Sequence, residues 1–207
     1  EATPIQQAAI PDILAGRDVM AAAQTGTGKT AAFALPIIQK LINAHPTKPP
    51  VDNDAKPSVD NAPNQVPKAL VLTPTRELAL QVFNSFKSYS QDTDITAAIA
   101  YGGVSLNPQI QAIKQGVSIV VATPGRLLDL LMKECIDLNQ IEYLVFDEAD
   151  RMLDMGFIND INRILRVMPE QRQTLLFSAT FDDAIFNLSK TLLKDPKLIE
   201  VDARNNA

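Results

Sequence analysis

Short apolar segments alternate with longer segments of helical period, and this alternation is the strongest constraint on what the chain can fold into. The short segments are rich in Val, Ile and Leu, which is typical of strands buried on both faces of a sheet. Strands that alternate with helices form parallel sheets, so the pattern predicts an α/β fold: a doubly wound, mostly parallel sheet with helices on both faces. The predicted strands are residues 19–22, 69–73, 96–101, 118–122, 143–147, 174–178 and 198–201. The predicted helices are residues 28–43, 75–89, 108–115, 125–134, 157–167 and 182–193.

Composition narrows the range of functions. The 207 residues, of which 46% are hydrophobic and 21% charged, are sufficient for one substantial core. A net charge of −5 argues against binding nucleic acid through bulk positive charge, so any such contact must be local. The only histidine is His45, which excludes a His-based triad and a His-rich metal site and leaves proton transfer to carboxylates.

The sequence also bears on the compartment. Cys135 is the only cysteine, which excludes an internal disulfide and favours a reducing environment. No apolar run approaches the roughly 18 residues that a membrane span needs, and the first residues lack the pattern of a signal peptide. We therefore expect a cytoplasmic protein that does not contact a membrane.

Residues 44–67 interrupt the alternation. They are dominated by Pro, Asn and Asp and contain almost no apolar residues to bury. We predict a solvated, flexible insertion in a single domain that otherwise spans the chain. A partner-binding arm is the alternative, although the segment shows neither a repeat nor an apolar face.

A phosphate-binding pattern follows the first predicted strand and begins the first predicted long helix. Residues 23–30, "AQTGTGKT", fit the P-loop pattern G-x-x-x-x-G-K-[ST], with Ala23 in place of the first glycine. In that context the loop amides and the helix N-terminus would point at an anion, Lys29 would reach the outer phosphates, and the Thr30 hydroxyl would coordinate Mg²⁺. The alternative is a glycine-rich turn with an exposed lysine. The predicted nucleotide-binding residues are Ala23, Gln24, Thr25, Gly26, Thr27, Gly28, Lys29 and Thr30.

Three acids follow the apolar run 143–146, namely Asp147, Glu148 and Asp150. Carboxylates crowded at the end of a buried strand repel one another unless a cation is present. We predict that Asp147 holds Mg²⁺ through its water shell and that Glu148 orients and deprotonates an attacking water, with Lys29 as the third catalytic group. A capping cluster for a following helix would account for one acid more readily than for all three.

The sequence Asp147-Glu148-Ala149-Asp150 resembles the signature of the DEAD-box family of ATP-dependent RNA helicases. The family's own P-loop also has alanine where this chain has Ala23, and "TPIQQ" at residues 3–7 is similar to its adenine-recognition motif, in which Gln6 would read the base. "DEADRMLDMGF" and the closing "IEVDARNNA" are similar to the bacterial group named RhlE. The resemblance implies a RecA-like P-loop domain that uses ATP and Mg²⁺.

Further motifs occur in the family's order. "PTRELA" (74–79), the glycine pair 102–103 and "TPGR" (123–126) resemble its RNA-contacting motifs, and "SAT" (178–180) resembles the motif that links hydrolysis to strand separation. The resemblance implies RNA contacts at Pro74, Thr75, Arg76, Gly102, Gly103, Thr123, Pro124, Gly125 and Arg126. It implies coupling roles for Asp150, Ser178, Ala179 and Thr180. Arg76 and Arg126 lie in the first turns of predicted helices, where an arginine and exposed amides could seat a phosphate; an ordinary salt-bridged side chain is the alternative.

The resemblance implies the first domain of an RNA helicase that couples Mg·ATP hydrolysis to local RNA duplex separation. With no Trp and with the Phe residues on apolar faces, we expect contact with the sugar–phosphate backbone and weak sequence preference. The family's second RecA-like domain, which supplies arginine fingers, has no counterpart here, and the aromatic residues that precede "TPIQ" are absent. We therefore expect residues 1–207 to be one domain truncated at both ends, with 202–207 starting an interdomain linker. Alone it should be monomeric, bind nucleotide weakly and be essentially inactive.

Two other functions remain to be distinguished from this one. Another P-loop NTPase, such as a DNA translocase or a GTPase, is less favoured because Gln6 suits adenine and the chain has no N-K-x-D sequence. An ATP-gated RNA-binding clamp or scaffold would carry the same motifs as a helicase.

Overall fold

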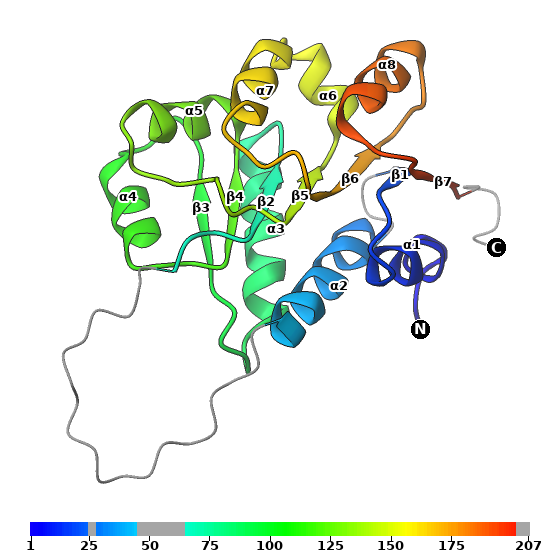
Figure 1. Cartoon of the computed structure of the whole chain (residues 1–207), viewed down its shortest axis with the longest axis horizontal. Helices are drawn as coiled ribbons and strands as arrows, with labels where there is room; N and C mark the ends of the chain where they lie inside the picture. Colours follow the sequence, from blue (N-terminus) through cyan, green and yellow to red (C-terminus); the bar gives the residue numbers. More distant parts are fainter. Residues whose placement is uncertain (25–27, 45–64, 202–207) are drawn as a thin grey trace, which may run out of the picture.

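The strands form one seven-stranded sheet, in the order β3-β4-β2-β5-β6-β1-β7 (Figure 1). This computed structural model describes residues 1–24, 28–44 and 65–201. The strands are β1 (Val19–Ala22), β2 (Ala69–Leu72), β3 (Ala97–Ala100), β4 (Ile119–Ala122), β5 (Tyr143–Phe146), β6 (Gln173–Ser178) and β7 (Lys197–Glu200). Every pairing in the sheet is parallel, so the prediction of a mostly parallel sheet is confirmed in its stricter form.

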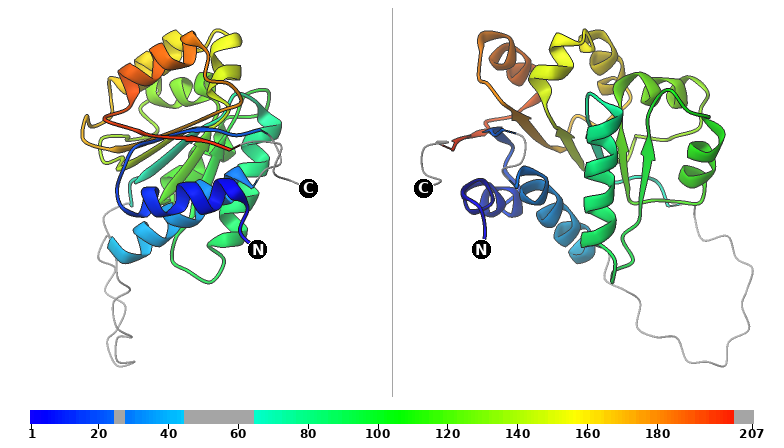
Figure 2. Two further views of the ribbon diagram at one scale, coloured as in Figure 1. Left: turned by 90° about the vertical axis from the view of Figure 1, so that its right-hand side faces the viewer. Right: turned by 180° about the vertical axis from the view of Figure 1, so that it is seen from behind.

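The helices form two layers, one on each face of the sheet, as Figure 2 shows edge-on. One layer contains α1 (Pro4–Leu14), α2 (Lys29–Ala44) and α3 (Arg76–Tyr89). The other contains α4 (Asn107–Lys114), α5 (Pro124–Met132), α6 (Ala149–Asp154), α7 (Ile158–Leu165) and α8 (Asp183–Leu192). The doubly wound architecture predicted from the alternation of strands and helices is therefore confirmed.

Helices α1 and α6 were not among the predicted helices. In α1, Ile5, Ala9 and Ile13 are buried at helical spacing, but Pro4 and Pro11 obscure the pattern. Pro4 is compatible with the helix because it occupies the first turn, where the missing N–H would have no intrahelical partner. Helix α6 is short and begins within the acidic segment. The three acids were interpreted as a cation site, and a helix following them was only the alternative.

Side chains along each strand alternate between the two cores. In β2, for example, Leu70 packs with the layer that contains α4–α8, whereas Val71 packs with the layer that contains α1–α3. Because both faces are covered, the strands are apolar at nearly every position. This explains why the strand positions could be predicted from short apolar runs.

Phe33 is the centre of the core beneath α2. It is fully buried, and its ring centroid lies 5.3 Å from that of Phe177 in β6 and 6.1 Å from that of Phe86 in α3. Phe146 is also fully buried. The interpretation of these phenylalanines as core residues is confirmed.

The edge formed by the amino ends of the strands is held by side chain to backbone hydrogen bonds. Gln173 donates to the carbonyl oxygens of Ile13 (2.9 Å) and Arg17 (2.7 Å). The carboxylate of Asp18 accepts from the backbone N–H of Thr174 (2.9 Å) and of Lys194 (2.7 Å). These polar groups have protein partners, so their hydrogen bonds stabilise this edge of the sheet.

The predicted insertion 44–67 lies largely outside the described residues. Its first residue, Ala44, is the last residue of α2, and Pro67 is buried next to β2. Residues 45–64, and the predicted linker 202–207, are not described. Within the described ranges, no helix has the length and apolar character to cross a membrane.

We expect Phe33→Ala to lower the free energy of unfolding by about 3–5 kcal/mol, because it leaves a cavity between α2, α3 and β6. Leu35→Ala is the matched control on the same helix: that side chain is 42% exposed, and its loss should cost about 0.5 kcal/mol or less. Urea denaturation followed by circular dichroism measures both. Equal losses in the two variants would contradict the assigned core.

Candidate functional site

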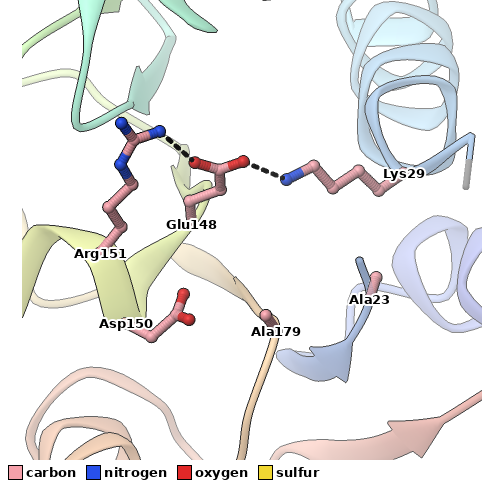
Figure 3. A pocket seen from close by; sticks show the side chains of 6 residues that line it. All are labelled: Ala23, Lys29, Glu148, Asp150, Arg151 and Ala179. Atoms are coloured by element: carbon pink, nitrogen blue, oxygen red, sulfur yellow. Dashed lines mark hydrogen bonds and ion pairs between the residues drawn. The ribbon is translucent and has the colours of Figure 1, made fainter. Parts of the chain in front are cut away.

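Lys29 is the centre of a cluster of charges at the carboxyl ends of the strands. It is the first residue of α2, directly after the loop that follows β1, and only 4% of it is exposed. Its Nζ lies 3.0 Å from Asp147 Oδ1 and 3.3 Å from Glu148 Oε1 (Figure 3 shows the contact with Glu148). The lysine and two of the acids that sequence analysis assigned to catalysis are thus in direct contact.

Asp147 immediately follows β5 and is completely buried. Its Oδ2 has no hydrogen-bond partner among the described residues. Burial raises the pKa of the Asp147 carboxyl above its ordinary value, and the Lys29 ammonium acts in the opposite direction. A buried carboxylate oxygen without a partner fits a hard cation such as Mg²⁺, which prefers oxygen ligands.

Glu148 is held in an unusual backbone conformation. Its φ of 56° and ψ of 54° place it in the left-handed region, at the N-cap of α6. A non-glycine residue there costs on the order of 1–3 kcal/mol, so the surrounding fold must impose the conformation. The carboxylate lies between two cations, with Lys29 on one oxygen and Arg151 Nη1 3.5 Å from the other (Figure 3).

An open pocket of about 230 Å³ adjoins these charges (Figure 3). It is lined by Ala23, Lys29, Glu148, Asp150, Arg151 and Ala179. These residues come from the ends of β1, β5 and β6 and from the starts of α2 and α6. Residues 25–27 of the predicted phosphate loop lie outside the described residues, so this lining is that of the described residues alone.

The predicted adenine motif packs directly against the P-loop. The side chain of Gln6 donates from Nε2 to the Gly28 carbonyl (3.2 Å) and accepts from the Thr3 backbone N–H (3.1 Å). Gly28 has φ +79°, and a Cβ added there would lie 2.7 Å from Gln6 Nε2 and 2.9 Å from Thr3 Oγ1. Glycine is therefore required at this position both by its conformation and by the close approach of α1.

The "SAT" segment lies beside the start of the P-loop. Ser178 ends β6 and pairs in register with Ala22 of β1, and its carbonyl accepts the backbone N–H of Ala23 at 2.9 Å. Ser178 Oγ is buried and has no hydrogen-bond partner among the described residues. Thr180, two residues further on, is exposed.

The predicted RNA-contacting segments follow β2, β3 and β4, three adjacent strands on the same edge. After β2, Thr75 caps α3 by accepting the Leu78 backbone N–H at 3.3 Å, and Arg76 is exposed. After β3, Gly102 and Gly103 are exposed. Pro74, the first residue of the segment after β2, is buried.

After β4, the third of these segments contains Arg126, whose guanidinium is already engaged. Nη2 donates to the Val104 carbonyl at 2.8 Å, and Nη1 donates to Gln109 Oε1 at 3.4 Å. Only 10% of the Arg126 side chain is exposed. Thr123 and Gly125 are half-buried, and Pro124 is buried at the start of α5.

Two residues of this edge were missed by the sequence analysis, Arg151 and Gln109. Arg151 lies three positions after Glu148 on the same short helix, a spacing that could have indicated the ion pair had α6 been predicted. Gln109 lies on α4, and its sequence neighbours give no sign that its side chain joins two other segments.

The sheet is parallel, Lys29 lies at the start of the helix after β1, and it contacts acids that follow β5, with β6 between these two strands. This is the arrangement of P-loop NTPases. The comparisons with known proteins are more specific. A sequence profile of the family "DEAD/DEAH box helicase" matches residues 3–188. The chain is 44% identical to "ATP-dependent RNA helicase CshA" of Listeria monocytogenes over 204 aligned residues. The alignment covers 99% of this chain and 36% of that protein. The chain is 49% identical to "Probable ATP-dependent RNA helicase ddx3" of Dictyostelium discoideum over 196 aligned residues. That alignment covers 92% of this chain and 27% of the relative.

Solved structures give the same result. A DEAD box protein from Methanococcus jannaschii is 38% identical with a TM-score of 0.82, over 99% of this chain and 51% of that one. A hypothetical ATP-dependent RNA helicase from Sulfolobus tokodaii is 38% identical with a TM-score of 0.81, and the match covers 97% of this chain and 53% of that one.

The chain therefore belongs to the DEAD/DEAH box helicase family, and its fold is that of the family's RecA-like domain. It spans about a third of the length of the curated relatives it matches. The similarity to the RhlE group stays a prediction.

We expect Gly28→Ala to lower the free energy of unfolding by about 2 kcal/mol or more, because it adds left-handed strain and displaces Gln6 from its hydrogen bond. Gly156→Ala is the matched control: φ there is +81°, but no atom lies within 4 Å of the added Cβ, so only the backbone cost of about 1 kcal/mol applies. Urea denaturation of both variants isolates the Gln6 contact. Identical losses would show that Gln6 does not brace the loop.

Proposed function

We propose that this chain is the first, ATP-binding domain of an ATP-dependent RNA helicase that couples binding and hydrolysis of Mg·ATP to local separation of RNA strands. The observation that carries the proposal is the contact of buried Lys29 with Asp147 and Glu148, at the edge of the sheet where the RNA-contacting motifs also lie. The relatives at 44% and 49% identity bear the names of ATP-dependent RNA helicases, which supports the same function here.

In the proposed nucleotide complex, Lys29 exchanges its carboxylate partners for the outer phosphates. In this exchange a phosphate oxygen would replace a carboxylate oxygen as the acceptor, so Lys29 would keep a charge-assisted hydrogen bond. Gln6 is proposed to read the adenine base, since its amide lies against the P-loop and keeps a second N–H and a second carbonyl lone pair besides those bonded to Gly28 and Thr3. The loop amides of residues 23–28 and the N-terminus of α2 would face the phosphates.

Asp147 and Thr30 are the proposed Mg²⁺ residues, with water completing the coordination. Mg²⁺ retains several waters and binds phosphates, so one carboxylate and one hydroxyl of the protein suffice as its proposed protein ligands. The bound ion would neutralise charge on the phosphates and bring a positive charge to the buried Asp147 carboxylate.

Glu148 is the proposed group that orients and deprotonates the attacking water. Its position in the lining of the pocket supports this proposal, because a general base must reach the proton that it removes. Ser178 and Ala179 are the proposed coupling residues, because the Ser178 carbonyl is hydrogen-bonded to the backbone of Ala23 and Ala179 lines the pocket. Asp150, which lines the pocket, and Thr180 are proposed to respond to a second RecA-like domain.

RNA binding is proposed at the segments after β2, β3 and β4. Helix N-termini, exposed glycines and Arg76 offer backbone amides and positive charge to phosphates, and the one aromatic ring beside the glycines, that of Tyr101, is half-buried and lies 5.1 Å from the Arg76 guanidinium. Contacts of this kind carry no base information, so weak sequence preference is expected.

In the full-length protein we expect Lys29→Ala to abolish ATP binding and Glu148→Gln to retain binding while lowering kcat for hydrolysis by about 10²–10⁴, the usual contribution of a general base. Nucleotide binding is measured by fluorescence titration, and turnover by phosphate release with RNA present. Strand release is followed together with ATP consumption, since an RNA clamp would consume ATP without releasing strands. Normal turnover by Glu148→Gln would refute the role assigned to Glu148.

The 207-residue chain alone is expected to bind Mg·ATP weakly and to hydrolyse it about 10³–10⁵ times more slowly than the full-length protein, because arginine fingers contribute factors of this size. Calorimetric titration and phosphate release measure the two quantities. Robust RNA-stimulated hydrolysis by the chain alone would show that no second domain is needed.

A further inference from the structure

The loop that contains Gly102 and Gly103 has little packing of its own. Both glycines are exposed, and a Cβ added at either would meet no atom within 4 Å. Gly103 also has φ +84°, where glycine keeps the backbone unstrained. The position of this loop therefore depends on how its two ends are held.

Gln109 holds the first end. It lies in α4, is only 7% exposed, and donates from Nε2 to the Tyr101 carbonyl at 3.1 Å. Its other amide atom, Oε1, accepts from Arg126 Nη1 at 3.4 Å. Both ends of one buried amide are thus used, one for the loop after β3 and one for the segment after β4.

Arg126 holds the second end, through the 2.8 Å hydrogen bond from its Nη2 to the Val104 carbonyl. The ring of Tyr101 in turn lies 5.1 Å from the Arg76 guanidinium, within the range of a cation–π contact. Gln109 thus joins the segments that follow β3 and β4, and the Tyr101–Arg76 contact joins the first of these to the segment after β2.

We propose that Gln109 is a positioning residue for RNA binding: it sets the glycine loop relative to the segment of residues 123–126, so that one stretch of RNA backbone meets both. The proposal rests on the proposed function and adds a residue to it. Gln109 itself does not face the solvent and is not proposed to contact RNA. Its loss would leave the Tyr101 carbonyl and one Arg126 nitrogen without their partner, and would free the loop to move relative to α5.

The test uses Gln109→Met in the full-length protein, because methionine has a similar length and adapts to irregular cavities but offers neither hydrogen bond. The RNA concentration that gives half-maximal ATP hydrolysis should rise about tenfold, the factor that corresponds to the loss of a hydrogen bond to a charged group. The kcat at saturating RNA and the KM for ATP should stay within about twofold of wild type, since the ATP pocket is lined by other residues. Gln111→Met is the matched control, because Gln111 lies on the same helix and is exposed, and it should behave as wild type.

A second variant guards against misfolding. Gln109→Glu keeps an acceptor for Arg126 but cannot donate to the Tyr101 carbonyl, so its half-maximal RNA concentration should rise about threefold, less than that of Gln109→Met. If Gln109→Met melts below the assay temperature, Gln109→Glu decides the question by the same measurement.

The outcomes separate the two proposals. Unchanged half-maximal RNA concentrations, or a parallel loss of kcat and of ATP affinity, would overturn the role of Gln109 and leave the helicase function standing. Absence of RNA stimulation in the wild-type protein would overturn the proposed function, and the role of Gln109 with it.

Discussion

The candidate site depends on one completely buried carboxylate. Asp147 follows β5 at a position from which water is excluded, and an ionised group there requires a positive charge close by. Lys29 supplies that charge at 3.0 Å and is itself 4% exposed, so each member of the pair compensates the burial of the other. The same arrangement keeps a buried ammonium group at the start of a helix, where phosphates bind best. Lys29 and Asp147 thus already lie together as an ion pair at the site where we propose that the nucleotide binds.

The parallel sheet determines which other residues share that edge. Because all strands run in the same direction, the segments after β1, β2, β3, β4, β5 and β6 meet at their carboxyl ends. The segments proposed to bind nucleotide follow β1, β5 and β6, and those proposed to contact RNA follow β2, β3 and β4. The opposite edge is occupied by the hydrogen bonds of Gln173 and Asp18 to backbone groups. The edge proposed to bind ligands and the edge held by the Gln173 and Asp18 hydrogen bonds therefore lie at opposite ends of the strands.

A feature of the fold or site could be predicted from the sequence when residues close together in the chain determine it. The strands could be predicted to within one residue at each end, because burial on both faces makes the central strands apolar at most positions, although the edge strand β7 is largely exposed. Helix α1 could not, since two prolines obscure its period, and neither could the left-handed conformation of Glu148, which the fold imposes on a residue with no such preference.

Long-range side-chain contacts were the least predictable. Arg126 could be placed in the first turn of a helix, but its hydrogen bond to Val104 spans 22 residues of sequence and leaves no local pattern. The same holds for Gln109, and for the hydrogen bond of Gln6 to the Gly28 carbonyl, also 22 residues apart. The residues of a motif can be assigned from sequence, whereas the partner of each side chain depends on how strands distant in sequence align.

The central claim is that Lys29 exchanges its carboxylate partners for nucleotide phosphates. A crystal structure of the chain with Mg²⁺ and a non-hydrolysable ATP analogue tests it most directly. We predict that Lys29 Nζ donates to phosphate oxygens and is no longer paired with Asp147, and that the Asp147 carboxylate faces a water bound to Mg²⁺. A structure in which the phosphates lie elsewhere while Lys29 stays paired with Asp147 and Glu148 would contradict the account.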